Sequence, residues 1–241
     1  MKLPSYLLIA LALFLSFGCA TTTKRLDTAD GTLEEADRLM EARFFEEART
    51  QLFRIKTEFQ ESALLVEADL RIADSYFRQS SWKAAASAYE DFIRTYPGRP
   101  EIPFAIYRLG LSHVRQMPSN PQRDSRSAER VLDVFSRLLV EFPDSPYAEE
   151  AIPHIQRAQN QLAEKGFSIA RFYERQGNFA AAATRYQEVF EIFPDHPRGE
   201  EALARRVRSL RRAGETEEAE RARKMFRETF PASQFQSMIQ P

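Results

Sequence analysis

The stretch AEKGFSIARFYERQGNFAAAATRYQEVFEIFP, residues 163–194, contains one complete pair of candidate helices. Counted from its first residue, positions 8, 11, 20, 24 and 32 are Ala170, Tyr173, Ala182, Tyr186 and Pro194. Two-helix repeats of about 34 residues place packing residues at such positions, with a small residue at position 20, where the two helices touch. The stretch therefore predicts two packed helices followed by a proline.

The same unit recurs along the chain. Its ends are marked by aromatic-Pro pairs, and by one degenerate pair, at Phe59-Gln60, Tyr96-Pro97, Phe142-Pro143, Phe193-Pro194 and Phe230-Pro231. No segment alternates with period two between turn signals, so a sheet is not expected. We therefore expect an all-α, right-handed solenoid of five tetratricopeptide (helix-turn-helix) repeats, with a divergent fifth repeat as its cap.

Repeats three and four are longer than the others. Successive unit ends are 37 residues apart in the regular repeats, but 46 and 51 residues apart here. The extra residues of repeat three fall at Met117–Pro121, where two prolines preclude a continuous helix. Those of repeat four lie between Tyr147 and Gln176, in a pattern that stays helical apart from Pro153. About four added turns lengthen a helix without changing the face that it presents.

Two predicted helix starts set the bounds of the two groups of repeats. Thr32 with Glu35 forms a capping box that is expected to open the first helix. Ser145 followed by Pro146 suits the N-cap and the first helical position of the long helix in repeat four. We therefore expect repeats one to three over 32–146 and repeats four and five over 147–241.

Residues 1–18 have the features of an export signal. Lys2 is a short positive region, and Tyr6–Phe17 is an apolar or small-residue run of 12 residues, shorter than the roughly 20 that span a membrane. The one cysteine of the chain, Cys19, follows at once. It resembles the lipobox cysteine whose thiol is acylated in bacterial lipoproteins. The alternative is ordinary secretory cleavage at Gly18-Cys19-Ala20.

The sequence departs from the lipobox motif at one position, and the residue after the cysteine indicates which membrane holds the protein. Ser16 stands three places before the cysteine, where the motif usually has Leu, and Leu15 lies one place further back. Ala20 follows the cysteine, where lipoproteins kept in the inner membrane often have Asp. The resemblance therefore implies a lipid-anchored outer-membrane location facing the periplasm. Residues 19–31 are then the lipidated cysteine and a polar tether.

Composition and motifs argue against several classes of function. With 43% hydrophobic and 29% charged residues, the chain of 241 residues can bury a core. Its formal net charge is −1, so no global field attracts nucleic acid. His113, His154 and His196 lack the spacing of metal ligands, and no phosphate loop or nucleophile elbow occurs. We therefore expect no metal, no cofactor and no enzymatic activity.

Three stretches go beyond what the generic repeat requires. They are Gln122-Arg123-Asp124, Phe142-Pro143-Asp144-Ser145-Pro146-Tyr147, and Leu162-Ala163-Glu164 with the run from Ile169 to Ala182. Together with the lipobox, the five repeats and the two insertions, they resemble the BamD (ComL/YfiO-like) family of outer-membrane protein assembly lipoproteins. The resemblance covers essentially the whole mature chain. Two departures are Gln122, where the family commonly has Asp, and a C-terminal repeat unusually rich in Arg.

The resemblance implies a scaffold in the β-barrel assembly machine. Its partners would be a BamA-like β-barrel subunit, bound through its periplasmic domain, other assembly-machine lipoproteins, and unfolded outer-membrane proteins. The lipid anchor would reach the membrane. The alternative is a repeat lipoprotein for pilus assembly or for cell-division and envelope organisation, although the lengthened helix in repeat four argues against it.

Three arginines are candidate partner-binding residues. Arg185 matches the Arg in the family's Ala-Ala-x-x-Arg stretch and stands beside the packing residue Tyr186. A guanidinium can hold a carboxylate with two hydrogen bonds, which Lys cannot do. Arg205 and Arg208, in the Arg-rich run 205–212, are the next candidates. The alternative for this run is a set of cations that suits the C-terminal end of a helix dipole.

The first helices of repeats two and three predict a client-binding groove. Positions on the concave side carry Leu70, Asp74, Phe77, Phe104, Tyr107, Leu111 and Val114, flanked by Arg78 and Arg115. An exposed apolar patch marks a binding site. Clients of the family tend to end in an aromatic residue, so we expect the groove to hold such a C-terminal segment, with an arginine on its carboxylate. The alternative is that these residues are core.

Overall fold

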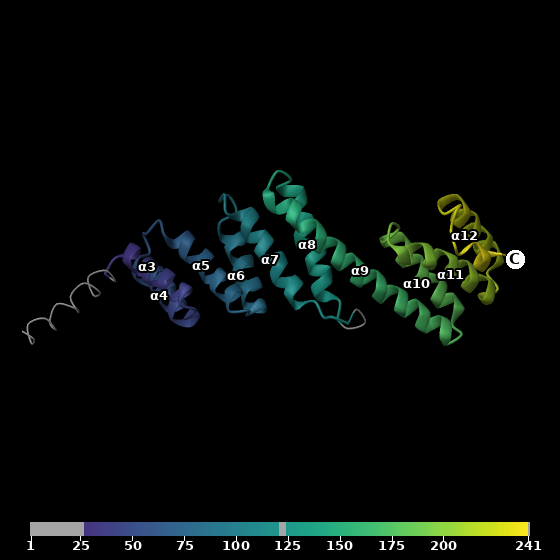
Figure 1. The fold of residues 1–241 in the computed structure, drawn as a ribbon, viewed down its shortest axis with the longest axis horizontal. Helices are drawn as coiled ribbons and strands as arrows, with labels where there is room; N and C mark the ends of the chain where they lie inside the picture. Colours follow the sequence, from purple (N-terminus) through teal and green to yellow (C-terminus); the bar gives the residue numbers. More distant parts are fainter. Residues whose placement is uncertain (1–26, 121–123, 241) are drawn as a thin grey trace, which may run out of the picture. The chain divides into compact units, whose positions relative to one another are not determined.

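The computed structural model describes residues 27–120 and 124–240, and all regular structure in these ranges is helical (Figure 1). The helices are α3 (Ala29–Glu41), α4 (Phe45–Glu58), α5 (Leu65–Arg78), α6 (Trp82–Thr95), α7 (Ile102–Gln116), α8 (Arg126–Glu141), α9 (Pro146–Arg175), α10 (Phe179–Ile192), α11 (Pro197–Ala213), α12 (Thr216–Thr229) and the 3-10 helix η1 (Gln236–Ile239). The predicted all-α class, a solenoid of tetratricopeptide repeats, is confirmed. The predicted leader and Cys19 lie outside the described residues.

The chain forms two compact units. The N-terminal unit ends at Ser112 and the C-terminal unit begins at His113, so the division falls inside α7. The grouping expected from the repeats instead separated 32–146 from 147–241. The second helix of repeat three, α8, packs against α9 and lies in the C-terminal unit.

Alanines pack the two helices of a repeat against each other. At positions 8 and 20 of repeats one, two and four the side chains are fully buried: Ala36, Ala48, Ala73, Ala85, Ala170 and Ala182. Tyr89 and Tyr186, at position 24 of repeats two and four, are also fully buried. Small side chains let the helices approach closely, and each tyrosine then fills the space beside the contact. The register predicted from the sequence is therefore the register of the core.

One backbone conformation recurs in the turn between the paired helices. Position 15 has a positive φ in four repeats, at Arg43 (65°), Ser80 (64°), Gly177 (75°) and Gly214 (81°). The next residue's N–H then donates to a carbonyl five residues earlier, as from Ser81 to Tyr76 at 2.9 Å. This left-handed Schellman arrangement satisfies carbonyls at the end of the first helix and turns the chain into the second.

The first helix begins earlier than predicted. The N-cap of α3 is Thr28, whose hydroxyl oxygen accepts a hydrogen bond from the Gly31 N–H at 3.1 Å. Thr32 is buried inside the helix, where its hydroxyl donates to the Thr28 carbonyl at 2.8 Å, and Glu35 forms an ion pair with Arg38. The predicted capping box is therefore wrong. A second threonine four residues upstream has the same capping chemistry, and the burial of Thr32 requires a bond inside the helix.

The predictions for the two insertions are confirmed in the described residues. In repeat three, α7 ends at Gln116, before Met117 and Pro118. In repeat four, α9 runs for 30 residues and continues through Pro153. It begins as expected, with the Ser145 hydroxyl oxygen accepting from the Tyr147 N–H at 3.3 Å and Pro146 at the first helical position.

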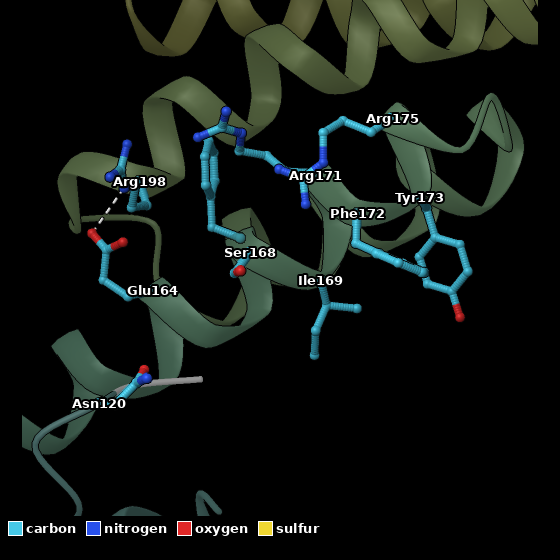
Figure 2. Close-up of a pocket in the computed structure, with 10 residues that line it drawn as sticks. Asn120, Glu164, Ser168, Ile169, Arg171, Phe172, Tyr173, Arg175 and Arg198 are labelled. Atoms are coloured by element: carbon cyan, nitrogen blue, oxygen red, sulfur yellow. Dashed lines mark hydrogen bonds and ion pairs between the residues drawn. The ribbon is translucent and has the colours of Figure 1, made fainter. Parts of the chain in front are cut away.

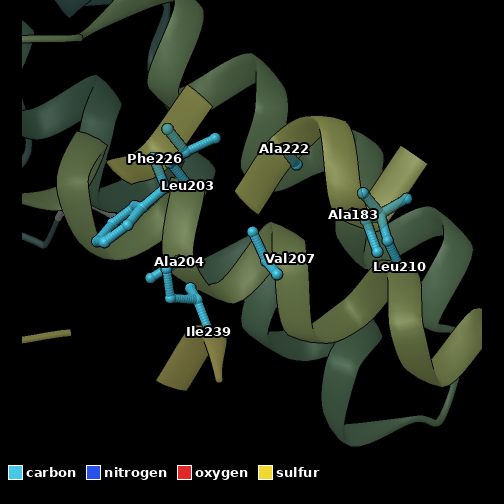
Figure 3. Packing of buried hydrophobic residues seen from close by; sticks show 9 residues of the cluster. Ala183, Leu203, Ala204, Val207, Leu210, Ala222, Phe226 and Ile239 are labelled. Atoms are coloured by element: carbon cyan, nitrogen blue, oxygen red, sulfur yellow. The ribbon is translucent and has the colours of Figure 1, made fainter. Parts of the chain in front are cut away.

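The C-terminal segment folds back onto the last repeat. Ile239, in η1, is fully buried in a cluster that includes Leu203, Val207 and Phe226 (Figure 3). Arg211 on α11 donates to the Ile239 carbonyl at 3.0 Å. The sequence did not predict this element, because a four-residue 3-10 helix has no periodicity to read.

Candidate functional site

The N-terminal unit has a charged pocket on the face built by its first helices. The pocket has a volume of about 560 Å³ and is lined by Asp37, Met40, Glu41, Arg71, Asp74, Arg78 and Arg108. Arg71 holds both carboxylate oxygens of Asp37, at 2.5 and 3.0 Å, and its Nη1 lies 2.8 Å from Glu67. Because Asp37 is on α3 and Arg71 is on α5, this bidentate pair fixes two neighbouring first helices together.

Arg108 occupies the other side of this pocket. Its guanidinium lies 4.5 Å from the centre of the Phe77 ring and 5.2 Å from that of Phe104, and its Nε is 3.9 Å from Asp74. The Asp74 carboxylate also accepts a hydrogen bond from the hydroxyl of buried Tyr89. Burial raises the pKa of Asp74 above its usual value, against the lowering effects of Tyr89 and Arg108. Polar groups from three helices, α5, α6 and α7, therefore meet at Asp74.

The groove was predicted to have an apolar floor, whereas the observed pocket is lined mainly by charged side chains. Two predicted residues, Asp74 and Arg78, line the pocket. The others differ: Leu70, Phe77, Phe104, Tyr107 and Leu111 are half-buried, and buried Val114 and exposed Arg115 lie in the C-terminal unit. Arg71 and Arg108 were missed because both stand at position 6, one place beyond the concave positions considered. The signal was available, since an arginine recurs at that position in consecutive repeats. The assignment of this face to client binding stays a prediction.

In the C-terminal unit, the Glu174 carboxylate accepts hydrogen bonds from three side chains. The carboxylate accepts from the Tyr186 hydroxyl at 2.8 Å, from Arg205 Nη1 at 3.1 Å and from Arg208 Nη2. Burial of the carboxyl acts to raise the pKa of Glu174, but the hydrogen bonds from Tyr186 and Arg208 and the charges of both arginines outweigh it, so the pKa lies below its usual value. Arg205 and Arg208, predicted as partner contacts, are thus engaged inside the unit and hold α11 on α9.

A second pocket, of about 520 Å³, lies along α9 and reaches α11 (Figure 2). It is lined by Asn120, Glu164, Phe167, Ser168, Ile169, Arg171, Phe172, Tyr173, Arg175 and Arg198. Arg198 forms an ion pair with Glu164 at 2.8 Å and lies 4.7 Å from the centre of the Phe167 ring. Arg171 and Arg175 are four residues apart on α9 and therefore lie on one side of the helix, as Figure 2 shows.

Arg185 lies on the surface of α10, as a partner contact requires. Its side chain is 47% exposed, and its Nη1 is 2.7 and 3.0 Å from the two carboxylate oxygens of Glu188. The hydrogen bond to Glu188 and its charge raise the pKa of Arg185, and the nearby Tyr173 adds to this. Phe172, itself 50% exposed, packs edge-on against Tyr173 at 5.7 Å. Arginine near a half-buried tyrosine is a composition typical of protein-binding hot spots.

The histidines have structural surroundings in this part of the chain. The Nδ1 atom of His196 accepts from the Arg198 N–H at 3.0 Å and caps α11, and His154 stacks on Phe135 at 5.7 Å. Desolvation lowers the pKa of His113, His154 and His196. Residues 27–120 and 124–240 contain no group of three His, Cys, Asp or Glu side chains arranged to hold a metal ion. Within the same ranges, no helix has both the length and the apolar character needed to cross a bilayer.

Pairs of helices that pack through buried alanines, as in this chain, are the architecture of a tetratricopeptide-repeat protein. Residues 27–225 match the family YfiO, described as an outer membrane lipoprotein, and the chain belongs to that family. Two relatives, both named outer membrane protein assembly factor BamD, come from Vibrio cholerae and Neisseria meningitidis serogroup A. The first is 26% identical over 227 residues, which is 90% of this chain and 94% of the relative. The second is 26% identical over 190 residues, which is 75% of this chain and 71% of the relative.

Similar solved structures include two other repeat proteins. The TPR2AB domain of yeast Sti1, in a pHSP90 complex, is 15% identical with a TM-score of 0.43, covering 84% of this chain and 78% of that one. YrrB, a TPR protein with an unusual peptide-binding site, is 17% identical with a TM-score of 0.38, covering 90% and 96%.

Proposed function

We propose that this chain takes part in the assembly of β-barrel proteins into the outer membrane, as a scaffold without enzymatic activity. The observation that carries the proposal is its membership of the YfiO family over residues 27–225, with full-length relatives named as assembly factors. Repeat solenoids act by presenting extended binding surfaces. The pockets on the inner faces of both units are consistent with that way of working.

The scaffold is anchored by acylated Cys19 and faces the periplasm. The motif at the end of the leader supports this part of the proposal, as does the family's description as an outer membrane lipoprotein. A lipid anchor keeps the repeats at the membrane surface, where a barrel subunit presents its periplasmic domain.

The C-terminal unit binds the periplasmic domain of a BamA-like barrel subunit. Exposed Arg185 and the half-buried Tyr173 near it supply the contact, since a guanidinium near an aromatic ring can hold a carboxylate while the ring buries apolar surface. Arg205 and Arg208 support the same surface indirectly, because their contacts with Glu174 fix α11 against α9. Other assembly-machine lipoproteins join the complex around this pair.

Co-purification from solubilised outer membranes tests this function. The tagged wild-type chain is expected to recover a BamA-like barrel subunit, and Arg185→Glu is expected to lose most of it. Arg221→Glu is a matched control, because Arg221 is also exposed and also pairs with a glutamate on its own helix, Glu218 at 2.9 Å. Recovery of pilus or cell-division proteins without a barrel subunit would refute the proposed function. Equal recovery by both variants, with helicity intact by circular dichroism, would refute only the role of Arg185.

The N-terminal unit receives unfolded outer-membrane proteins. In the described part of the chain Arg78 has no carboxylate within ion-pair distance, and its exposed guanidinium is 5.8 Å from the centre of the Phe45 ring. It is therefore available for a client carboxylate at the edge of the charged pocket. A photoreactive residue at Tyr107 is expected to capture a peptide ending in Phe, and to lose that capture when the Phe is removed or when Arg78 is changed to Glu. Equal capture of both peptides would show that this face makes only nonspecific contacts with clients.

A further inference from the structure

The inner face of the C-terminal unit carries arginines in excess of its carboxylates. Arg198, Arg205 and Arg208 are paired with Glu164, Glu201 and Glu174. These three arginines and three glutamates cancel one another in charge. The low pKa of Glu174 keeps that carboxylate ionised in mildly acidic solution.

Three further arginines on this face have no such partner. Across residues 27–120 and 124–240, no carboxylate lies within ion-pair distance of Arg171, Arg175 or Arg212. Arg212 lies 5.2 Å from the centre of the Phe179 ring, one helical turn beyond Arg208, which itself contacts α9. The face therefore has three uncompensated positive charges.

Two of these cations belong to a recess rather than a flat surface. Arg171 and Arg175 line the 520 Å³ pocket along α9, on the same side of the helix (Figure 2). Apolar side chains border them: Ile169 is 39% exposed and Phe172 is 50% exposed. A recess with cations and exposed apolar groups is complementary to a chain that carries carboxylates and at least one apolar side chain.

We propose that Arg171, Arg175, Arg212 and Phe172, here called the arginine face, bind an extended acidic segment of another protein. The guanidinium groups take Asp or Glu carboxylates in bidentate hydrogen bonds, and Phe172 takes an apolar side chain of the same segment. An extended segment can enter the recess, whereas the headgroups of a flat anionic membrane can reach only its rim. This site lies beyond the contact proposed for the barrel subunit at Arg185, and it does not depend on that contact.

Fluorescence anisotropy with the chain lacking its leader tests the proposal. The probe is a short labelled peptide of Asp and Glu with a central Phe, alongside a version with Ser in place of Phe. Wild type is expected to bind the Phe peptide more tightly than the Ser peptide, and binding is expected to weaken as salt is raised. Arg171→Glu combined with Arg175→Glu should reduce the affinity at least about tenfold, because two attractions become repulsions.

The matched control is Arg157→Glu combined with Arg227→Glu. This pair changes the net charge equally at two exposed arginines outside the pocket, one of them on α9 itself. It should keep the wild-type affinity, and Arg185→Glu should also keep most of it, so this proposal can fail while the barrel contact stands. Equal loss in both double variants would show an effect of net charge alone and overturn the proposal. So would sedimentation of the wild type with anionic phospholipid vesicles, dependent on Arg171 and Arg175, in the absence of peptide binding.

Discussion

Tyr89 and Tyr186 occupy the same position in repeats two and four, and each links three helices. Tyr89 donates to Asp74, which also lies 3.9 Å from Arg108 of the next first helix. Tyr186 donates to Glu174, which is held by Arg205 of the next first helix at 3.1 Å. In both cases a tyrosine on the second helix reaches a carboxylate on the first, and that carboxylate reaches an arginine of the following repeat. These polar links fix the spacing of the repeats, which apolar packing alone leaves less specific.

Glu174→Gln is expected to destabilise the protein by about 2 kcal/mol at neutral pH, because the hydrogen bonds from Arg205 and Arg208 lose their charged acceptor. The folded-state pKa of Glu174 is below its unfolded value of about 4.3, so the stabilisation is present above that pH and is lost as the pH falls through the folded pKa. Urea unfolding of both proteins between neutral and acidic pH measures this effect. A stability difference that stays constant down to the acid limit would contradict the assignment.

Ser80→Gly is expected to stabilise the protein by about 0.5–1 kcal/mol. The φ of Ser80 is 64°, a left-handed conformation that glycine adopts without steric cost, and repeats four and five already have Gly177 and Gly214 at this position. The Schellman hydrogen bond from Ser81 to Tyr76 does not involve the side chain and should persist. Thermal unfolding measures the change. Ser87→Gly, in the helical interior of α6, is the control and should instead lower the melting temperature.

At the scale of the elements, a glycine permits the tight entry into α11. An added Cβ at Gly199 would lie 2.5 Å from the Phe193 carbonyl oxygen and 3.0 Å from that of Pro194. Backbone oxygens cannot move aside as a flexible side chain can, so Gly199→Ala should destabilise the C-terminal unit by about 1–3 kcal/mol. Gly98→Ala, where nothing lies within 4 Å, is the matched control and should change stability by less than about 0.5 kcal/mol. Similar urea midpoints for the two variants would show that the α10–α11 turn relaxes freely.

The sequence predicted the elements better than it predicted their ends. Alanine and tyrosine spacing gave the register of the repeats, because a two-helix contact tolerates only small side chains at fixed places. It misplaced the start of α3, since Thr28 and Thr32 offer the same capping chemistry and only burial distinguishes them. It could not show η1, whose stability comes from burying Ile239 against α11 rather than from local propensity.

At the scale of the whole molecule, the sequence placed candidate arginines on the surface but did not show which of them are paired with carboxylates. Position counting placed Arg78 and Arg185 on surfaces, where the structure has them. It did not separate Arg205 and Arg208, which pair with Glu174, from Arg171 and Arg175, which lack a carboxylate within reach among the described residues. The partners of an arginine lie on another helix, at sequence separations that a repeat pattern does not encode. Only the packed structure could therefore distinguish positioning arginines from available ones.

Cys19→Ser is expected to release the whole protein from the outer membrane or to stall its processing. Cys19 is the one cysteine of the chain and follows the apolar run of the leader directly. A single acyl chain gives only marginal membrane binding, whereas the several chains of a mature bacterial lipoprotein hold firmly. Fractionation of cells that produce the variant, with detection of the chain in outer-membrane and periplasmic fractions, measures the outcome. The repeats should fold unchanged, because residues 27–120 and 124–240 build their core without this segment, and circular dichroism of the released protein checks that point. If the variant remained in the outer-membrane fraction, the anchor would have to be a protein partner, and the Arg185→Glu variant would then be expected to release it.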